Sequence, residues 1–412
     1  MNPLYNLGIR LYGLGIRCVA GRNKKAELLR AGQNRALDYL RDVITEKGKY
    51  VWVHAASLGE FEQGRPLIER IKKEQPGSKV LLTFFSPSGY EVRKNYEGAD
   101  AICYLPLDTP GNVKKFLDIV QPRMAVFVKY EFWGNYLHGL ARRGIPTYLI
   151  SAIFRPKQIF FRPWGKMFRG MMDCYNHIFV QDENSRNLLA ASGVTNVTVA
   201  GDTRFDRVVD IMKQTFDIPE CEAFSPKGRD FTTVIAGSSW GPDEAFLLPY
   251  FNSHPEVRLI IAPHEVNEER IAEIESKLTR PVCRLSKCTV EEAAKSDCLI
   301  VDCYGKLSSL YRYGDLAYIG GGFGVGIHNL NEAAVYGIPV VFGPNHGKFK
   351  EARDLKECGG GFSFTDKDGF TAIMSRLVGD RQYLSKAGDA AGKYIKDSIG
   401  ATDVVYSYLF SR

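Results

Sequence analysis

The stretch YVWVHAASLGE, from Tyr50 to Glu60, changes from a continuous apolar run to small residues and ends on a carboxylate. An apolar run of this length, bounded by a small-residue turn, is typical of a buried strand. The next segment, EQGRPLIERIKKEQ (residues 62–75), has the spacing of an amphipathic helix. A buried strand that leads into such a helix predicts a parallel sheet covered by helices on both faces.

The same pattern recurs along the chain in two series of strand-like runs. The first series continues with KVLLTFF (79–85), MAVFVKY (124–130), TYLISAI (147–153), HIFVQ (177–181) and VTVAG (197–201). The second series contains FTTVIAGSS (231–239), VRLIIAPHE (257–265), PVCRLS (281–286), CLIVDC (298–303), LAYIGGGF (316–323) and IPVVFGP (338–344). Together they predict an α/β protein of two doubly wound domains that face each other across a cleft, with ligands at the carboxyl ends of the strands.

The domain bounds follow from where this rhythm starts, breaks and ends. Residues 206–230 contain two prolines and no clear strand, which indicates a linker. We predict an amphipathic, membrane-associating segment at 1–30, an N-terminal domain at 31–205, the linker at 206–230, a C-terminal domain at 231–390, and a C-terminal helix at 391–412 that packs back on the N-terminal domain.

Composition limits the possible partners. The 412 residues contain 54 Lys and Arg against 47 Asp and Glu, a net charge of +7. Because no basic block is present, this modest excess argues against a nucleic-acid partner and suits anionic small molecules or an acidic membrane surface. No apolar stretch reaches the ~18 to 20 residues that span a bilayer.

The first 20 residues mix apolar side chains with Arg10 and Arg17. A helix lying in the headgroup plane of an anionic leaflet has this composition, and a helix packed on the protein is the alternative. The nine cysteines, without a secretory signal, indicate a reducing compartment. The group Cys283, Cys288, Cys298 and Cys303 is spaced more widely than most zinc sites and borders strand-like runs, which favours core thiols over a metal site.

A carboxylate follows the first strand-like run. Small residues at 55–57 and Gly59 allow a tight turn that presents Glu60 at the start of the next helix. There it could remove a proton from an attacking hydroxyl. A helix-start carboxylate stabilised by the helix dipole is the structural alternative, and Glu62 is the rival for the catalytic role.

A second carboxylate, Glu131, follows the run at 124–130 and lies beside Trp133 and Asn135. It could bind sugar hydroxyls or orient catalytic partners. A helix cap or a core ion pair is the alternative. In the same domain Arg204, in the segment GDTRFD (201–206), ends a strand-like run and could neutralise an anionic sugar or phosphate.

The second domain contains a glycine run at 320–322, continued by Gly-Val-Gly at 324–326. Glycines after a strand let a ligand phosphate approach main-chain N–H groups, and a helix beginning near Asn329 would add its positive end. Glu332 would then lie on the first turn, within reach of a ribose diol. The candidate ligand contacts in this domain are Ser238, Pro263, His264, Gly305, Lys306, Leu307, Gly321, Gly322, Asn329, Leu330, Asn331 and Glu332.

Several motifs in one order resemble a known family, the 3-deoxy-D-manno-octulosonic acid (Kdo) transferases of lipopolysaccharide assembly, which have the GT-B fold. The motifs are WVHAASLGE, YLPLDTP, EFWGN, FVQDENSRNLLAASG, GDTRFD, GGGF, HNLNEAA and YGIPVVFGPN. The resemblance implies transfer of Kdo from CMP-Kdo to the lipid A precursor (lipid IVA) at the cytoplasmic face of the inner membrane. It also implies a peripheral membrane contact and no metal or other cofactor.

By position, Glu60 looks like the family's proton acceptor, and Glu131 resembles a carboxylate of its acceptor side. Pro263 with His264, the segment 305–307 and the segment 329–332 look like its CMP-binding elements. The chain departs from the family pattern in four places: His264-Glu265 stands where Arg-His is common, Arg204 replaces a Lys, Gly134 replaces a Pro, and the Gly-Val-Gly is extra.

Other functions are compatible with parts of this pattern. A GT-B enzyme that acts on a UDP-sugar, as a transferase or an epimerase, would share the two domains. A membrane-tethered nucleotide-binding module would need no catalytic carboxylate. A dinucleotide oxidoreductase is disfavoured, because the glycine run lies late in the chain and lacks the Gly-x-Gly-x-x-Gly turn with an acidic residue about 20 positions on.

Overall fold

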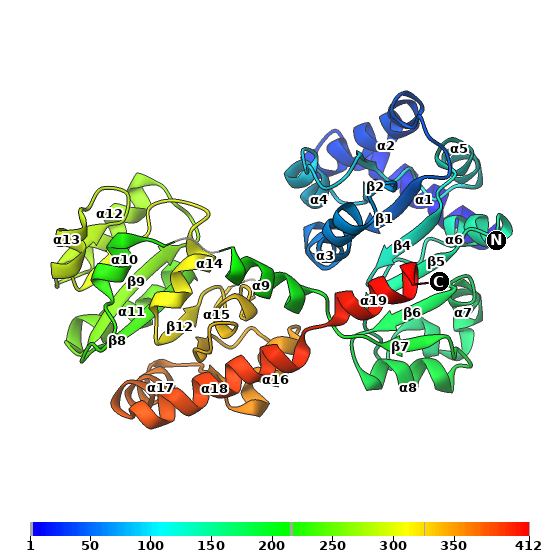
Figure 1. The fold of residues 1–412 in the computed structure, drawn as a ribbon. Helices are drawn as coiled ribbons and strands as arrows, with labels where there is room; N and C mark the ends of the chain where they lie inside the picture. The colour runs from blue at the N-terminus through cyan, green and yellow to red at the C-terminus, as the bar shows by residue number, and fades with distance from the viewer. Residues whose placement is uncertain (1–2, 215–216, 325, 412) are drawn as a thin grey trace. The chain divides into compact units, whose positions relative to one another are not determined.

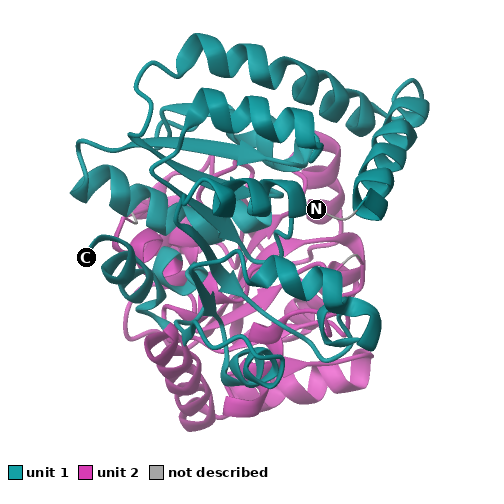
Figure 2. Ribbon diagram, turned by 90° about the vertical axis from the view of Figure 1, so that its right-hand side faces the viewer, with its two compact units in different colours: residues 1–207, 399–412 teal, residues 208–398 magenta. Residues whose placement is uncertain are grey.

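The computed structural model describes residues 3–214, 217–324 and 326–411, and the chain divides into two compact units (Figure 1, Figure 2). Unit 1 comprises residues 1–207 and 399–412, and unit 2 comprises residues 208–398. Val325, in the Gly-Val-Gly at 324–326, lies outside the described residues.

Unit 1 contains a seven-stranded parallel sheet in the order β3-β2-β1-β4-β5-β6-β7. The strands are β1 (Tyr50–Ala55), β2 (Lys79–Phe84), β3 (Ala101–Tyr104), β4 (Met124–Val128), β5 (Thr147–Ala152), β6 (His177–Val180) and β7 (Val197–Val199). Six of them lie in the predicted runs. β3 is not among the predicted runs.

Helices cover both faces of this sheet (Figure 1). They are α1 (Pro3–Val19), α2 (Lys24–Val43), α3 (Leu58–Glu74), α4 (Pro87–Arg93), α5 (Pro110–Val120), α6 (Gly134–Arg142), α7 (Lys166–Met172), α8 (Glu183–Ala191) and α19 (Ala401–Phe410). Alternate residues of β1 enter two cores, because successive strand side chains point to opposite faces. Tyr50 and Trp52 pack with residues of α2, α5 and α6, whereas Val51 and Val53 pack with α3 and α19.

The end of the chain lies in unit 1. α18 (Arg381–Ser398) belongs to unit 2 and spans the position 390/391 at which the predicted C-terminal helix begins. Gly400, with φ of +103°, separates it from α19, whose Val405 and Leu409 pack in the core on the α3 side of the sheet. Asp206 accepts hydrogen bonds from the N–H groups of Gly400 (2.6 Å) and Thr402 (2.7 Å), which fixes the start of α19.

Unit 2 also contains seven parallel strands, in the order β10-β11-β9-β8-β12-β13-β14. The strands are β8 (Thr232–Ser239), β9 (Val257–Pro263), β10 (Val282–Arg284), β11 (Cys298–Ile300), β12 (Leu316–Ile319), β13 (Val340–Phe342) and β14 (Gly361–Ser363). β14 is absent from the prediction, because it has three residues and begins at a glycine. Burial raises the pKa of the Cys298 thiol, as expected for a core cysteine.

The helices of unit 2 are α10 (Pro219–Phe224), α11 (Gly241–Ser253), α12 (Glu268–Ser276), α13 (Val290–Lys295), α14 (Leu307–Leu310), α15 (Asn331–Ala334), α16 (Lys350–Cys358) and α17 (Lys367–Gly379), followed by α18. α9 (Arg204–Lys213) spans the boundary between the two units. The predicted linker, 206–230, thus contains α10 and most of α9, where the sequence indicates only the absence of a strand. No helix in the described part of the chain is long and apolar enough to cross a bilayer.

Candidate active site

Glu60, Glu131, Ser238 and the glycine run lie where the strand order of each sheet reverses. In unit 1 the chain runs from β1 outward to β2 and β3, then returns to β4 on the other side of β1. The loops after β1 and β4 therefore diverge, and open α/β sheets bind ligands at such a point. Glu60 follows β1 and Glu131 follows β4. In unit 2 the equivalent strands are β8, which ends with Ser238 and Ser239 and is followed by Trp240, and β12, which is followed by the glycine run.

Strained backbone is concentrated at these strand ends. Four described residues other than glycine have positive φ, and three of them end strands: Lys129 (71°) after β4, Ser151 (51°) in β5 and Ser238 (53°) in β8. Ser238 lies at a register shift between Gly237 and Ser239 in the pairing of β8 with β9. Such conformations cost about 1–3 kcal/mol each and cluster at functional sites.

Glu60 lies on the first turn of α3 and is half-buried. The Ser57 hydroxyl donates a hydrogen bond to its Oε2 instead of capping the helix. The N-terminal dipole of α3 favours a charged carboxylate here. Burial, and to a lesser degree the charge of Glu60, raises the pKa of Tyr130, so the Glu60 carboxylate lies near the residue that precedes Glu131. Glu62, the rival, forms ion pairs with Arg93 (2.8 Å) and Arg65 (4.0 Å).

Glu131 ends a buried chain of hydrogen bonds. Trp52 donates its Nε1–H to the Thr83 hydroxyl at 2.8 Å, and that hydroxyl lies 2.8 Å from His54 Nδ1. His54 Nε2 lies 3.0 Å from Glu131 Oε2. His54 Nδ1 also lies 3.1 Å from the Thr83 main-chain carbonyl oxygen. Because an ionised carboxylate only accepts hydrogen bonds, Nε2 carries the proton that His54 donates to Glu131.

Two further contacts hold the Glu131 segment. The indole N–H of Trp133 donates to Glu131 Oε2 at 2.5 Å, and the Tyr175 hydroxyl donates to the Glu131 main-chain carbonyl. Glu131 is 6% exposed, so its position is set by these partners rather than by solvent. The contacts of Glu131 are therefore those of a buried core pair, the alternative named above, and its partner is His54.

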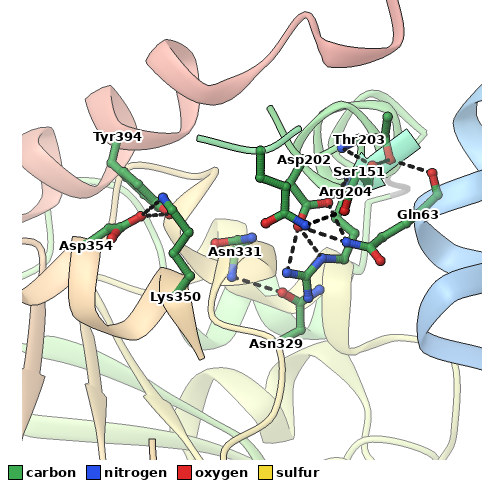
Figure 3. A network of polar contacts seen from close by, with 11 residues as sticks. Gln63, Ser151, Asp202, Thr203, Arg204, Asn329, Asn331, Lys350, Asp354 and Tyr394 are labelled. Atoms are coloured by element: carbon green, nitrogen blue, oxygen red, sulfur yellow. Dashed lines mark hydrogen bonds and ion pairs between the residues drawn. The ribbon is translucent and has the colours of Figure 1, made fainter. Parts of the chain in front are cut away.

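Arg204 pairs with a buried carboxylate in unit 1 (Figure 3). Asp202 accepts from Arg204 Nε at 2.9 Å and Nη2 at 2.8 Å, and from Gln63 Nε2 at 3.1 Å. Burial alone raises the pKa of Asp202, but the charge of Arg204 and these hydrogen bonds outweigh it, so the net pKa is below its ordinary value. The other predicted donor contacts belong to unit 2.

The glycine loop of unit 2 is organised by Asp243, which is 1% exposed. Its carboxylate accepts from the Trp240 N–H (2.9 Å), the Gly321 N–H (3.0 Å) and the Tyr318 hydroxyl (2.9 Å). Gly321 has φ of +90°, and a Cβ there would lie 2.5 Å from the Gly326 carbonyl oxygen. The loop is thus folded against backbone, and Gly322 packs in the same way against Gly343.

Aromatic rings join three of the predicted segments. His264 stacks on Trp240 at 4.3 Å and on His328 at 4.8 Å between ring centroids. Trp240 Nε1 donates to His328 Nε2 at 3.4 Å, and the His328 N–H bonds to the Gly320 carbonyl. Burial and the neighbouring His264 lower the pKa of His328. The ends of β8, β9 and β12 therefore form one cluster, with Pro263 buried beneath the exposed His264.

The segment 305–307 contacts this cluster through Leu307. Lys306 precedes α14, and Leu307 packs against Gly237 at the end of β8. Gly305 has φ of +82°, which a glycine adopts readily.

A helix begins near Asn329, as expected, and Glu332 lies on its first turn, but this helix has only one turn. α15 has four residues and begins at Asn331, and the Asn329 side chain accepts from the Asn331 N–H at 3.1 Å (Figure 3). A single turn has little dipole to offer a phosphate, because the dipole sums over aligned peptides. Asn329 instead donates to Glu332 Oε1 at 3.0 Å, and Leu330 is buried. Within the described residues, the buried Oδ1 of Asn331 has no hydrogen-bond donor, an acceptor that a ligand hydroxyl could satisfy.

Sequence reasoning missed three functional candidates: His54, Thr83 and Asp243. His54 and Thr83 are polar residues inside apolar strands, which is the signal that could have found them. Asp243 follows Trp-Gly-Pro, and an acidic residue just after a proline at a helix start indicates a capping position. The described residues contain no group of three or more His, Cys, Asp or Glu arranged to hold a metal ion.

Comparison with known proteins shows which family the chain resembles. Residues 29–207 match the family model described as 3-deoxy-D-manno-octulosonic-acid transferase (kdotransferase). A relative from Aquifex aeolicus, named 3-deoxy-D-manno-octulosonic acid transferase, is 26% identical over 84% of this chain and 92% of its own length. A relative of the same name from Bordetella pertussis is 27% identical over 85% of each chain.

Solved structures show the fold. UDP-GlcNAc 2-epimerase from Neisseria meningitidis superposes with a TM-score of 0.58 at 16% identity, covering 88% of this chain and 100% of its own. MurG from Acinetobacter baumannii superposes with a TM-score of 0.56 at 13% identity, covering 88% and 100%. The chain is therefore similar to 3-deoxy-D-manno-octulosonic acid transferases over most of its length, and it has the GT-B fold.

Proposed function

We propose that this chain transfers Kdo from CMP-Kdo to the lipid A precursor (lipid IVA), with inversion at the anomeric carbon and Glu60 as general base. The observation that carries the proposal is the relationship to proteins named Kdo transferase over 84% of this chain. The positions of Glu60 and Glu131 after the two strands of the switch point support it.

Glu60 is better suited to proton removal than its rival. Its carboxylate accepts from the Ser57 hydroxyl and forms no ion pair with the described residues, whereas two arginines neutralise Glu62. In the proposed step Glu60 takes the proton of an acceptor hydroxyl while that oxygen bonds to the anomeric carbon of Kdo. The bond from that carbon to the CMP phosphate breaks, and CMP leaves with the electron pair.

Glu131 acts in this proposal as a fixed carboxylate on the acceptor side. Its hydrogen bonds from His54 and Trp133 hold it in one orientation. A group held this way can position a sugar hydroxyl without reorganising during the reaction.

The donor is proposed to bind unit 2, at the joined ends of β8, β9 and β12. Ser238, Pro263, His264 and the loop with Gly321 and Gly322 form that surface, together with 305–307 and Asn329 to Glu332. Main-chain N–H groups of unit 2 and the basic side chain of Lys306 would neutralise the leaving phosphate in place of a metal.

The proposed location is the cytoplasmic face of the inner membrane, with α1 as a peripheral contact. Leu4, Leu7, Leu11 and Leu14 of α1 are each more than half exposed, and α1 has no buried residue. An exposed apolar stripe beside basic residues is typical of a helix in the headgroup plane.

The test is Kdo transfer from CMP-Kdo to lipid IVA, followed by the mass of the lipid product. Glu60→Gln should fold and bind CMP normally but lose at least about a hundredfold in kcat, the usual contribution of a general base. Glu62→Gln is the matched control and should retain near wild-type kcat. Near wild-type turnover by Glu60→Gln would refute the assignment, and inhibition by UDP but not CMP would refute the donor.

A further inference from the structure

A pocket of about 430 Å³ lies in unit 1 between α1, α2 and the loop that leads into α5. Its basic wall consists of Arg10 and Arg17 from α1 and Arg30 from α2, and no Asp or Glu lines it. Leu14 and Leu37 are among its apolar lining residues. The pocket therefore combines positive charge with an apolar surface.

The three arginines have no acidic partner among the described residues, whereas most arginines elsewhere in the two units form ion pairs, as Arg65 does with Glu69. A guanidinium presents five N–H donors in a plane that matches phosphate oxygens. Three such groups around one space, without a carboxylate, produce a positive potential that selects an anion.

Two amide side chains of the wall are already fixed by hydrogen bonds. Gln33 donates to the Leu105 carbonyl at 3.0 Å, and Asn112 donates to the Leu107 carbonyl at 3.0 Å. Each amide uses its N–H in these bonds, which directs its oxygen to other donors such as hydroxyl groups. α5 begins at Pro110, so its positive end adds to the potential of the arginines.

The open side of the pocket borders an apolar surface. Leu7, Leu11 and Leu14 on α1 are 53%, 57% and 51% exposed, at the spacing that places them on one helix face. Gly13 lets α1 lie against the wall, because a Cβ there would be 2.7 Å from Leu107 Cδ2.

We propose that this pocket binds the phosphorylated sugar head group of a lipid, with the phosphate on Arg10, Arg17 and Arg30. Sugar hydroxyls contact Gln33 and Asn112, and the acyl chains continue along Leu7 and Leu11. The volume is that of a small-molecule site of roughly 300–1,000 Å³, much larger than one phosphate ion needs. Since the head group is that of the acceptor, the assignment rests on the proposed function.

The test is equilibrium binding of bisphosphorylated lipid IVA in neutral detergent micelles, without CMP-Kdo. Arg10→Gln/Arg30→Gln should weaken binding at least about tenfold, the effect of losing two charge-assisted contacts. Arg22→Gln/Lys25→Gln removes the same charge from nearby exposed positions outside the pocket and should bind like wild type. After phosphatase treatment of the lipid, all three proteins should bind equally. Because the substituted side chains are exposed, the Tm of each variant should match wild type.

Three outcomes would overturn the proposal. Equal weakening by both double variants would indicate diffuse attraction to an anionic surface, which phosphatidylglycerol vesicles would reproduce. Unchanged affinity of the pocket variant would remove the arginines from binding. Displacement of lipid IVA by an equal concentration of inorganic phosphate would indicate a site for small anions. A wild-type protein that binds the phosphorylated lipid in this way but transfers no Kdo would refute the proposed function instead.

Discussion

His54 Nε2 and Glu131 Oε2 lie 3.0 Å apart inside unit 1, with side chains 0% and 8% exposed. β1 and β4 are neighbours in the sheet, so the last residues of β1 lie beside the segment that follows β4. A carboxylate buried at such a point needs hydrogen bonds to offset its lost hydration, and His54 and Trp133 supply them.

Glu131→Gln tests whether the charge of this carboxylate contributes to transfer. The amide keeps the size and one acceptor oxygen, so we expect a change of about 1 kcal/mol or less in the free energy of unfolding. We expect kcat to fall at least about tenfold, because an oriented charge is lost. Steady-state kinetics with CMP-Kdo and lipid IVA measure this. An unchanged kcat would assign Glu131 to structure alone.

Thr83→Val removes the hydroxyl that links Trp52 to His54. Two buried polar groups, Trp52 Nε1–H and His54 Nδ1, then lose a partner, which should lower the free energy of unfolding by about 1–3 kcal/mol. Urea denaturation measures the loss. Thr83→Ser keeps the hydroxyl and is the control. It should lose less than Thr83→Val, and an equal or larger loss would show that the hydroxyl contributes no more to stability than the methyl group that Ser lacks.

Arg204→Met should destabilise unit 1 in a pH-dependent way. The net pKa of Asp202 is lowered in the folded chain, so in wild type its stabilising contribution is complete above the ordinary carboxyl pKa of about 3.9 and is lost as the pH falls through the folded pKa. Without Arg204, burial dominates and raises the folded pKa, so the buried charge destabilises at neutral pH and protonation relieves it.

The difference in unfolding free energy between wild type and Arg204→Met should therefore be largest at pH 7, about 3–5 kcal/mol, and should shrink toward pH 4. Urea unfolding at both pH values checks this. Asp202→Asn/Arg204→Met removes the unpaired charge and should recover part of the loss at pH 7. A pH-independent difference would contradict the ion-pair explanation.

Asp243→Asn should weaken CMP binding without any contact to the nucleotide. The carboxylate receives two main-chain N–H groups and the Tyr318 hydroxyl, and an amide offers one acceptor oxygen and two donors that clash with those N–H groups. We expect a rise of about tenfold in the Kd for CMP, measured by calorimetry. Tyr318→Phe removes one of the three bonds and should give a smaller effect; unchanged affinity in Asp243→Asn would show that the glycine loop does not contribute to binding.

Local pattern was enough for most of the fold. Twelve of the fourteen strands among the described residues lie in predicted apolar runs that border turn residues, and β3 and β14 do not. The helix expected near Asn329 has only one turn and begins at Asn331. Asn329 lies in the preceding loop, where its side chain bonds to Asn331 and Glu332, and the hydrophobic period of the sequence does not reveal these contacts.

The sequence by itself determined the alternation of strands and helices, the two-domain α/β class and the strand-end positions of Glu60 and Glu131, because hydrophobic period and turn residues act over a few positions. Only the tertiary structure decided which strand ends meet. His54 and Glu131 are 77 positions apart, and Gln63 and Asp202 are 139 apart. Such pairs form because strand order brings distant segments together, and strand order is set by packing of the whole sheet.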